Sequence, residues 1–156
     1  MTAVTATDDV PAIVRVPLRG LLRTNLVATV LAAAATEAFT ALVRVAGVHL
    51  AVGDPGGGAS SVVPLDPGAC AIALVMVMVF GFGLAALINR RSSRPARAYT
   101  LAASALALVS LAAPLTAAAT STGTRLTLVA AHLIAAAVIV PLVGRRLKGD
   151  RSPSSR

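Results

Sequence analysis

The sequence predicts an all-α integral membrane protein, a four-helix bundle with both termini in the cytoplasm. The 156 residues are 56% hydrophobic and only 13% charged, whereas a soluble domain carries about 25% charged residues. The mean hydropathy of the chain is +0.83. The apolar residues form four long blocks, and most cations lie beside these blocks. These observations argue against a soluble globule and against a disordered chain.

Each apolar block is long enough to cross a bilayer core as a helix, which takes about 17–25 residues. The runs are continuous rather than alternating, and they are dominated by alanine, a strong helix former, so helices are favoured over strands. A helix also pairs its own backbone groups within the span. The predicted spans are residues 26–48, 70–88, 98–115 and 126–143.

The first span, 26–48, contains two charged residues, Glu37 and Arg44. A cleaved signal peptide is the alternative interpretation, because arginines precede the span. The span is longer than the usual hydrophobic region of such a peptide and carries a carboxylate in its middle. We therefore expect a retained helix that follows a cytoplasmic tail, residues 1–25.

The other three spans contain no Asp, Glu, Lys or Arg. Small residues recur at helical spacing on two of them and predict close helix packing, although the abundance of alanine explains the pattern nearly as well. On the third span the stripe consists of Ala103, Ala107, Ser110 and Pro114, and on the second it consists of Ala73, Gly81 and Ala85.

The segments between and beyond the spans predict little regular structure. The connection 49–69 is dense in Gly and Pro, which predicts turns rather than a folded domain. The connection 116–125 is rich in Thr and Ala, which is compatible with a helix that caps the bundle. Residues 146–156 are predicted to form a disordered, basic C-terminal tail.

The cations predict the orientation of the four-helix domain, residues 26–145. Twelve of the 14 Lys and Arg residues lie before the first span, between the second and third, or after the fourth. The positive-inside rule places these segments in the cytoplasm, so the protein is expected to be a multi-pass protein of a bacterial plasma membrane. A pI near 11.7 is also compatible with phosphate binding, but the position of the cations favours the topological interpretation. No nucleic-acid partner is expected, and membrane lipids are.

Glu37 is the strongest candidate for chemistry. It lies about 16 Å along the helix from the start of the first span, which is near the bilayer centre. A charged carboxylate there costs about 2.5 kcal/mol or more. We therefore expect Glu37 to face the bundle interior, where desolvation favours its protonated form.

His132 is the second candidate, about 9 Å inside the fourth span. Arg44 shares a helix face with Glu37, and Arg125 shares one with His132. His132 and Glu37 differ in depth by about two turns, a gap that helix tilt or different span ends would have to close. If that holds and the first and fourth spans are neighbours, the four side chains converge in the outer half of the bundle and form an acid–base site. Two structural alternatives stay open: Arg44 extends to the interface, and His132 hydrogen-bonds a helix carbonyl for packing alone.

Further residues are candidates for binding a lipophilic substrate beside the catalytic pair Glu37 and His132. The set consists of Arg44, Asp66, Met76, Phe80, Ser110 and Arg125. Asp66 has an alternative role as a turn or N-cap residue, and the apolar members have one in lipid contact or packing. The single cysteine, Cys70, allows no intrachain disulfide, and no metal and no cofactor are expected.

The sequence also resembles a known family. The segment LVSLAAPLTAAATSTGTRLTLVAAHLIAAAVIVPLVGRRL is similar to the C-terminal half of small actinobacterial four-span membrane proteins of unknown function, the DUF6069 type. The residues that carry the resemblance are Ser110, Pro114, Thr124, Arg125, Leu128, His132, Pro141, Arg145 and Arg146. The end of the first span, VRVAGVHLAV, looks similar too. The resemblance implies a four-span bundle and adds interest to His132, but it implies no activity.

Three classes of function fit these observations. The first is a membrane enzyme that isomerises or cyclises an isoprenoid-like molecule without a cofactor, with Glu37 as acid and His132 as base or tuning partner. The second is a proton-coupled transporter subunit, which requires a homo-oligomer because four short helices enclose little pathway. The third is a non-catalytic accessory protein. Sequence motifs for nucleotide hydrolysis, zinc proteolysis and dithiol chemistry do not occur.

Overall fold

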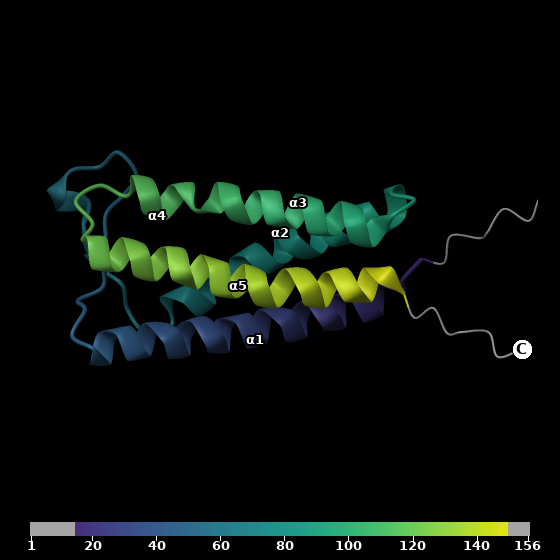
Figure 1. Cartoon of the computed structure of the whole chain (residues 1–156), viewed down its shortest axis with the longest axis horizontal. Coiled ribbons are helices and arrows are strands. Elements are labelled where there is room, and N and C mark those ends of the chain that lie inside the picture. Colours follow the sequence, from purple (N-terminus) through teal and green to yellow (C-terminus); the bar gives the residue numbers. More distant parts are fainter. Residues whose placement is uncertain (1–14, 150–156) are drawn as a thin grey trace, which may run out of the picture.

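The computed structural model describes residues 15–149 and contains, in that part of the chain, four helical segments long and apolar enough to cross a membrane. Figure 1 shows them as a bundle in which both ends of the described chain lie at the same end. This confirms the predicted all-α four-helix membrane fold. The helices are α1 (Leu18–Val45), α2 (Ala69–Arg91), α3 (Pro95–Ser110), the short α4 (Ala112–Thr116) and α5 (Thr122–Lys148).

The helices extend beyond the apolar stretches that predicted them. α1 begins at Leu18, directly after Pro17, whereas the apolar stretch begins at Leu26. α5 continues to Lys148, so the first residues of the predicted C-terminal tail are helical. Hydropathy marks the part of a helix that suits lipid, whereas backbone hydrogen bonding continues into the basic flank. The rest of the predicted tails, residues 1–14 and 150–156, lies outside the described residues.

The third span is interrupted near its end, where α3 stops at Ser110 and α4 begins at Ala112. Pro114 explains the break, because it has no N–H to donate to Ser110 and its ring crowds that carbonyl. α3 and α4 together still form one membrane-length segment, Pro95–Thr116.

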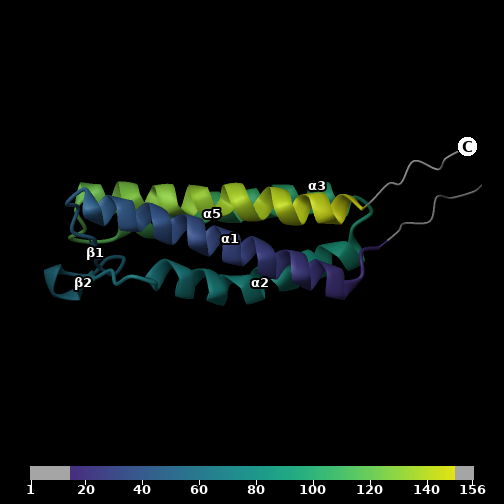
Figure 2. The same cartoon turned by 90° about the horizontal axis from the view of Figure 1, so that it is seen from below.

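The most extensive packing in the bundle is between α1 and α5, and α1 lies between α5 and α2 in Figure 2. Small side chains line this contact and let the two backbones approach closely. The buried residues of α1 are Leu21, Asn25, Ala28, Thr29, Ala32, Thr36 and Thr40, and those of α5 include Thr124, Thr127, Ala131 and Ala135. The main seam of small residues is therefore on the first and fourth spans. On the second and third spans, Ala85 and Pro114 are buried but Ala73 is exposed.

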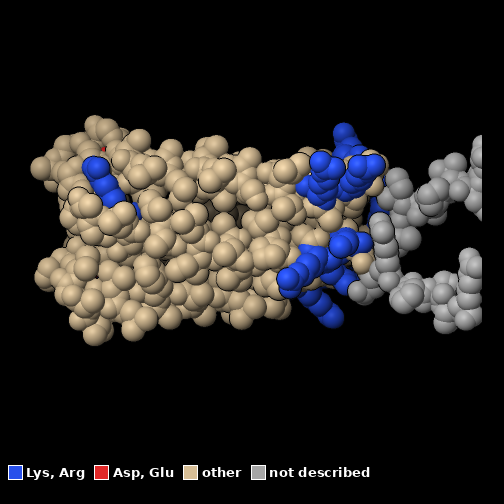
Figure 3. Space-filling model, in the orientation of Figure 1, with Lys and Arg blue, Asp and Glu red and all other residues tan. Residues whose placement is uncertain are grey.

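The large buried side chains lie at one end of the bundle, near the α2–α3 connection. Tyr99 is 2% exposed, and Leu21 and Val143 are fully buried. Most of the described cations are on the same end, which we call the basic end (Figure 3). These are Arg15, Arg19, Arg23, Arg90, Arg91, Arg94, Arg97, Arg145, Arg146 and Lys148.

The opposite end, which we call the loop end, is more ordered than the prediction of simple turns. β1 (Ala51–Val52) pairs antiparallel with β2 (Val63–Pro64), and a 3-10 turn, η1 (Ala59–Ser61), lies between them. The Gly53 N–H donates to Thr120 Oγ1 at 3.0 Å, which joins this hairpin to the second loop. A Cβ at Gly53 would collide with the Ala118 carbonyl, so this close approach requires glycine. Residues 117–121 of the second loop are not helical, although their composition was compatible with a helix. The loop covers this end of the bundle together with the hairpin.

Candidate functional site

Glu37 binds the N-terminus of α2. Its Oε2 accepts a hydrogen bond from the Gly68 N–H at 3.0 Å, and its Oε1 accepts one from the Ala71 N–H at 3.0 Å. The first turn of any helix leaves N–H groups without partners, and an anion is favourable there. Gly68 precedes α2 with φ 92° and provides no side-chain cap. Glu37 therefore caps α2 from the neighbouring helix.

This contact places Glu37 beside the first turn of α2, near the loop end, rather than at mid-length of the neighbouring helix. The expected depth of Glu37 was counted along its own helix, from the start of the apolar stretch of the first span. The neighbouring helix α2 begins at Ala69, at the same level as Glu37. The side chain is half-buried and turned toward α2. Both oxygens of the side chain thus act as hydrogen-bond acceptors.

Arg44 holds the segment that leads into α2. Its Nη2 donates to the Leu65 carbonyl at 2.9 Å, and its Nη1 lies 3.5 Å from Thr40 Oγ1. Glu37 and Arg44 therefore both hydrogen-bond the backbone of residues 65–71. We call this arrangement the α1–α2 clamp. Within residues 15–149 the two charged groups form no ion pair with each other; each bonds the backbone instead.

His132 bonds within its own helix. Its Nδ1 lies 2.7 Å from the Leu128 carbonyl, one turn earlier in α5, so the Nδ1–H tautomer donates there. This is the hydrogen bond expected from the packing interpretation. No hydrogen bond joins His132 to Glu37 in the described part of the chain.

Arg125 lies at the loop end of α5 and binds the second loop. Its Nη2 donates to the Ala117 carbonyl at 2.8 Å, whereas its buried Nε has no hydrogen-bond partner among the described residues. The structure thus groups Glu37 with Arg44 and places Arg125 on the same helix as His132. Within the described residues, 15–149, no hydrogen bond or ion pair links Glu37 and Arg44 to Arg125 and His132.

The other predicted substrate-binding residues lie apart from the α1–α2 clamp or on the exterior. The Asp66 side chain is exposed, and its carbonyl accepts from the Ala69 N–H in the turn before α2. Met76 is 66% exposed and Phe80 is 79% exposed, so both lie on the outer face of α2. The Ser110 hydroxyl donates to the Ala107 carbonyl at 2.7 Å, within α3. Among the described residues no group of three or more His, Cys, Asp or Glu side chains lies close enough together to hold a metal ion.

The chain's two asparagines make contacts that sequence reasoning missed. Asn25 Nδ2 donates to the Met78 carbonyl at 3.2 Å, midway along α2. Asn89 makes two bonds to Val16, accepting from its N–H at 3.3 Å and donating to its carbonyl at 2.9 Å. Both asparagines are buried, and a buried amide is costly unless it is hydrogen-bonded. Their presence in apolar helices was therefore the sequence signal that could have predicted these contacts.

Arg15 reinforces the Asn89 contact at the basic end. Its Nη1 donates to the Asn89 carbonyl at 2.8 Å and also to the Arg90 carbonyl. A cation is favourable at a helix C-terminus, where carbonyls lack partners. α2 is thus held by polar contacts from the α1 side at its start, middle and end.

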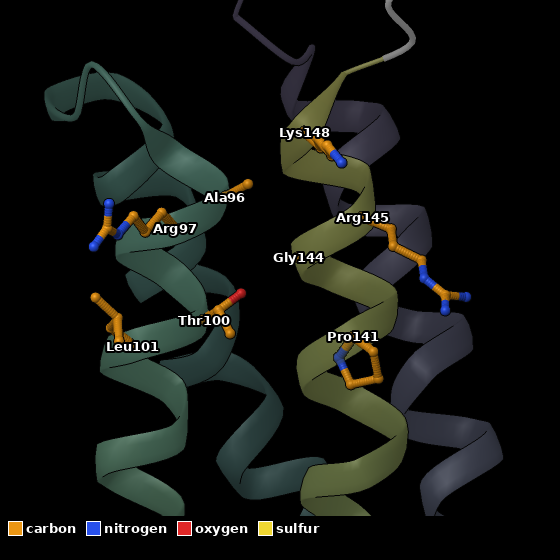
Figure 4. A pocket seen from close by; sticks show the side chains of 8 residues that line it. All are labelled: Ala96, Arg97, Thr100, Leu101, Pro141, Gly144, Arg145 and Lys148. Atoms are coloured by element: carbon orange, nitrogen blue, oxygen red, sulfur yellow. The ribbon is translucent and has the colours of Figure 1, made fainter.

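A groove of about 380 Å³ lies between α3 and α5 at the basic end (Figure 4). We call it the α3–α5 groove. It is separate from the α1–α2 clamp, and none of the eight predicted site residues lines it. Its lining consists of Ala96, Arg97, Thr100 and Leu101 of α3 and Pro141, Gly144, Arg145 and Lys148 of α5.

Comparison with known proteins places the chain in a family. The model of DUF6069, described as a family of unknown function, matches residues 16–149. No curated protein and no solved structure matches the chain. The match covers nearly the whole described fold and confirms the resemblance found in the sequence. The chain therefore belongs to the DUF6069 family.

Proposed function

We propose that this protein is a non-catalytic, multi-pass membrane protein in which Glu37 holds the helices together. The observation that carries this proposal is the pair of hydrogen bonds from Gly68 and Ala71 to the two oxygens of Glu37. A residue expected to donate a proton is instead occupied as an acceptor on both oxygens. An accessory or scaffolding role in the membrane agrees with this use of the carboxylate.

The environment explains why a carboxylate serves as a cap. An unpaired backbone N–H costs several kcal/mol in lipid, so the start of α2 gains from a partner. Hydrogen bonds to an ionised acceptor are about twice as strong as neutral ones. The cost of placing Glu37 in the span is thus offset by the two N–H groups that it satisfies.

The other polar groups of the helices are used in the same way. Arg44, Asn25 and Asn89 each bond a backbone atom of a neighbouring segment. His132 bonds a carbonyl of its own helix. The contacts of Arg44, Asn25 and Asn89 connect segments whose lateral surfaces are apolar, which is the role expected of polar side chains between helices in lipid; the contact of His132 stays within α5.

The competing proposal is the membrane isomerase or cyclase of an isoprenoid-like substrate, with Glu37 as acid and His132 as base. It requires α2 to release Glu37 and the two side chains to approach each other across the bundle. A proton-coupled transporter with Glu37 as relay also requires α2 to release Glu37. Neither movement is needed for a structural role.

We also propose that the basic end faces the cytoplasm of a bacterial cell and that the loop end faces outward. The ten described cations at the basic end support this orientation through the positive-inside rule. Both ends of the described chain would then lie on the cytoplasmic side.

Thermal unfolding of Glu37→Gln in detergent tests the structural role. The substitution keeps one carbonyl oxygen but removes the charge and the second acceptor, so we expect a loss of about 1.5–3 kcal/mol. That corresponds to a decrease in Tm of roughly 5–10 °C. The enzyme proposal instead predicts normal stability with abolished turnover.

Asp66→Asn is the matched control. It makes the same change from carboxylate to amide at an exposed side chain in the turn before α2. We expect its Tm to equal that of the wild type. An unchanged Tm for Glu37→Gln, measured beside this control, would contradict the structural proposal.

A further inference from the structure

The α3–α5 groove is lined by one face of each helix. Residues 96, 97, 100 and 101 recur at spacings that place them on a single side of α3, and residues 141, 144, 145 and 148 do so on α5. Gly144 is buried, and a Cβ built there would lie 3.0 Å from Thr100 Oγ1. The missing side chain at Gly144 therefore lets the two helices approach at the floor of the groove.

Three cations border this groove. In Figure 4 the guanidinium groups of Arg97 and Arg145 point away from each other, outward from α3 and from α5, and Lys148 is at the last turn of α5. All three acidic residues of the described chain, Glu37, Asp54 and Asp66, are near the loop end. Within residues 15–149 these cations therefore have no carboxylate to neutralise them. The lining of the groove is mostly apolar, and its mouth at the basic end is flanked by positive charge that attracts an anion.

Thr100 supplies an unused hydroxyl. In α1 and α5, the hydroxyls of Thr24, Thr29, Thr36 and Thr127 donate to carbonyls one turn earlier. The Thr100 hydroxyl makes no hydrogen bond to any described residue, and it points toward α5 in Figure 4. It is free to donate to a molecule in the groove.

The lining changes from charged to apolar along the helices. Arg97 is in the first turn of α3 and Lys148 is the last residue of α5, so both lie at the membrane-surface level of the bundle. Leu101 and Pro141 lie one or two turns further along the helices toward the loop end, and Leu101 is 63% exposed. An occupant that matches this order has an anionic head at the surface and an apolar chain directed into the bilayer.

We propose that the α3–α5 groove binds one anionic glycerophospholipid. Its phosphate lies at the mouth of the groove, where the flexible side chains of Arg97, Arg145 and Lys148 turn toward it on binding. Thr100 donates to a phosphate or ester oxygen, and an acyl chain follows Leu101 along the apolar lining. Basic pockets between membrane helices at this level suit anionic headgroups. This proposal does not depend on the structural role of Glu37, because the groove and the α1–α2 clamp share no residue.

Native mass spectrometry of lipids retained by the purified protein tests the proposal. The protein is equilibrated with equal amounts of phosphatidylglycerol and phosphatidylcholine in detergent. We expect preferential retention of one phosphatidylglycerol, and binding about fivefold weaker for each groove cation that is removed. Equal retention of the two lipids by the wild type would overturn the proposal.

The matched control removes the same number of charges from the same end. Equal weakening in both triple variants would show diffuse attraction to the basic end and would overturn a defined site. The groove variant is Arg97→Gln, Arg145→Gln and Lys148→Gln, and the control is Arg19→Gln, Arg23→Gln and Arg91→Gln.

Two further arms keep the test decisive if a triple variant misfolds. Thr100→Val preserves the shape of the side chain and removes only the hydroxyl, so phosphatidylglycerol retention should decrease a few-fold. Unchanged retention would contradict the placement of the headgroup. Inorganic phosphate in large excess should not displace the lipid, because it makes no contact with Leu101; displacement would assign the site to a free anion instead.

Discussion

At the residue scale, the carboxylate, guanidinium and amide side chains of Glu37, Arg44 and Asn89 pair backbone groups of neighbouring segments, whereas most hydroxyls bond carbonyls of their own helix. Glu37 pairs two N–H groups at the start of α2, and Asn89 pairs the N–H and the carbonyl of Val16. Arg44 pairs the Leu65 carbonyl. Because these backbone groups are buried or half-buried, each such bond replaces a partner that solvent would otherwise supply.

Asn89→Ala is expected to destabilise the protein. Asn89 is 3% exposed, so alanine would leave both backbone groups of Val16 without their partner in a buried place. The expected loss is about 1–3 kcal/mol, measured as a decrease in Tm in detergent. Ser93→Ala is the control, because Ser93 is exposed in the same end of the molecule. Equal Tm values for the two variants would show that the Val16 contact contributes nothing.

Sequence reasoning identified Glu37 and Arg44 as unusual but not their partners. A carboxylate in an apolar span is visible in the sequence, whereas its bonding to Gly68 depends on where α2 begins and how α1 crosses it. The proposed meeting of Glu37 and His132 assumed that α1 and α5 are neighbours, which the structure supports. The packing of α1 against α5 does not bring Glu37 and His132 into contact, because each of the two side chains already has a backbone partner.

At the element scale, α2 shows how an apolar helix is held in place. It is the most apolar of the four membrane-length segments and the least buried. Lipid is as apolar as its side chains, so burial alone gives little reason for it to pack. Glu37 and Asn25 of α1 bond its start and its middle, and its own Asn89 bonds Val16, so polar contacts at three levels fix its position against α1.

The sequence predicted the helical elements well because the length of an apolar run and the bilayer thickness are physically linked. Their ends were less predictable, as at Leu18, because a helix continues into a charged flank without a change of backbone. The hairpin β1–β2 was not predicted. Its strands have only two residues each, and they are held by contacts such as Gly53 with Thr120 rather than by a strand pattern.

At the scale of the whole molecule, the two ends of the bundle differ in charge and construction. The basic end carries ten described cations and the large buried side chains, whereas the loop end carries the hairpin and the three described carboxylates. This asymmetry was visible in the sequence, because the cation clusters alternate with the spans. It supports one orientation in the membrane.

Labelling with a membrane-impermeant maleimide tests that orientation. In a Cys70→Ser background, Ser60→Cys places a thiol at the loop end and Ser93→Cys places one at the basic end; both positions are exposed. In intact cells we expect labelling of Ser60→Cys only, with Ser93→Cys labelled after permeabilisation. The reverse pattern would invert the proposed topology.

Amide hydrogen exchange at Gly68 and Ala71 tests whether Glu37 caps α2. Both amides donate to the carboxylate, so they should be protected in the wild type. Loss of about 1.5–3 kcal/mol of hydrogen bonding in Glu37→Gln predicts exchange at least about tenfold faster at one or both amides. Equal exchange rates at both amides in the wild type and Glu37→Gln would show that Glu37 does not cap α2.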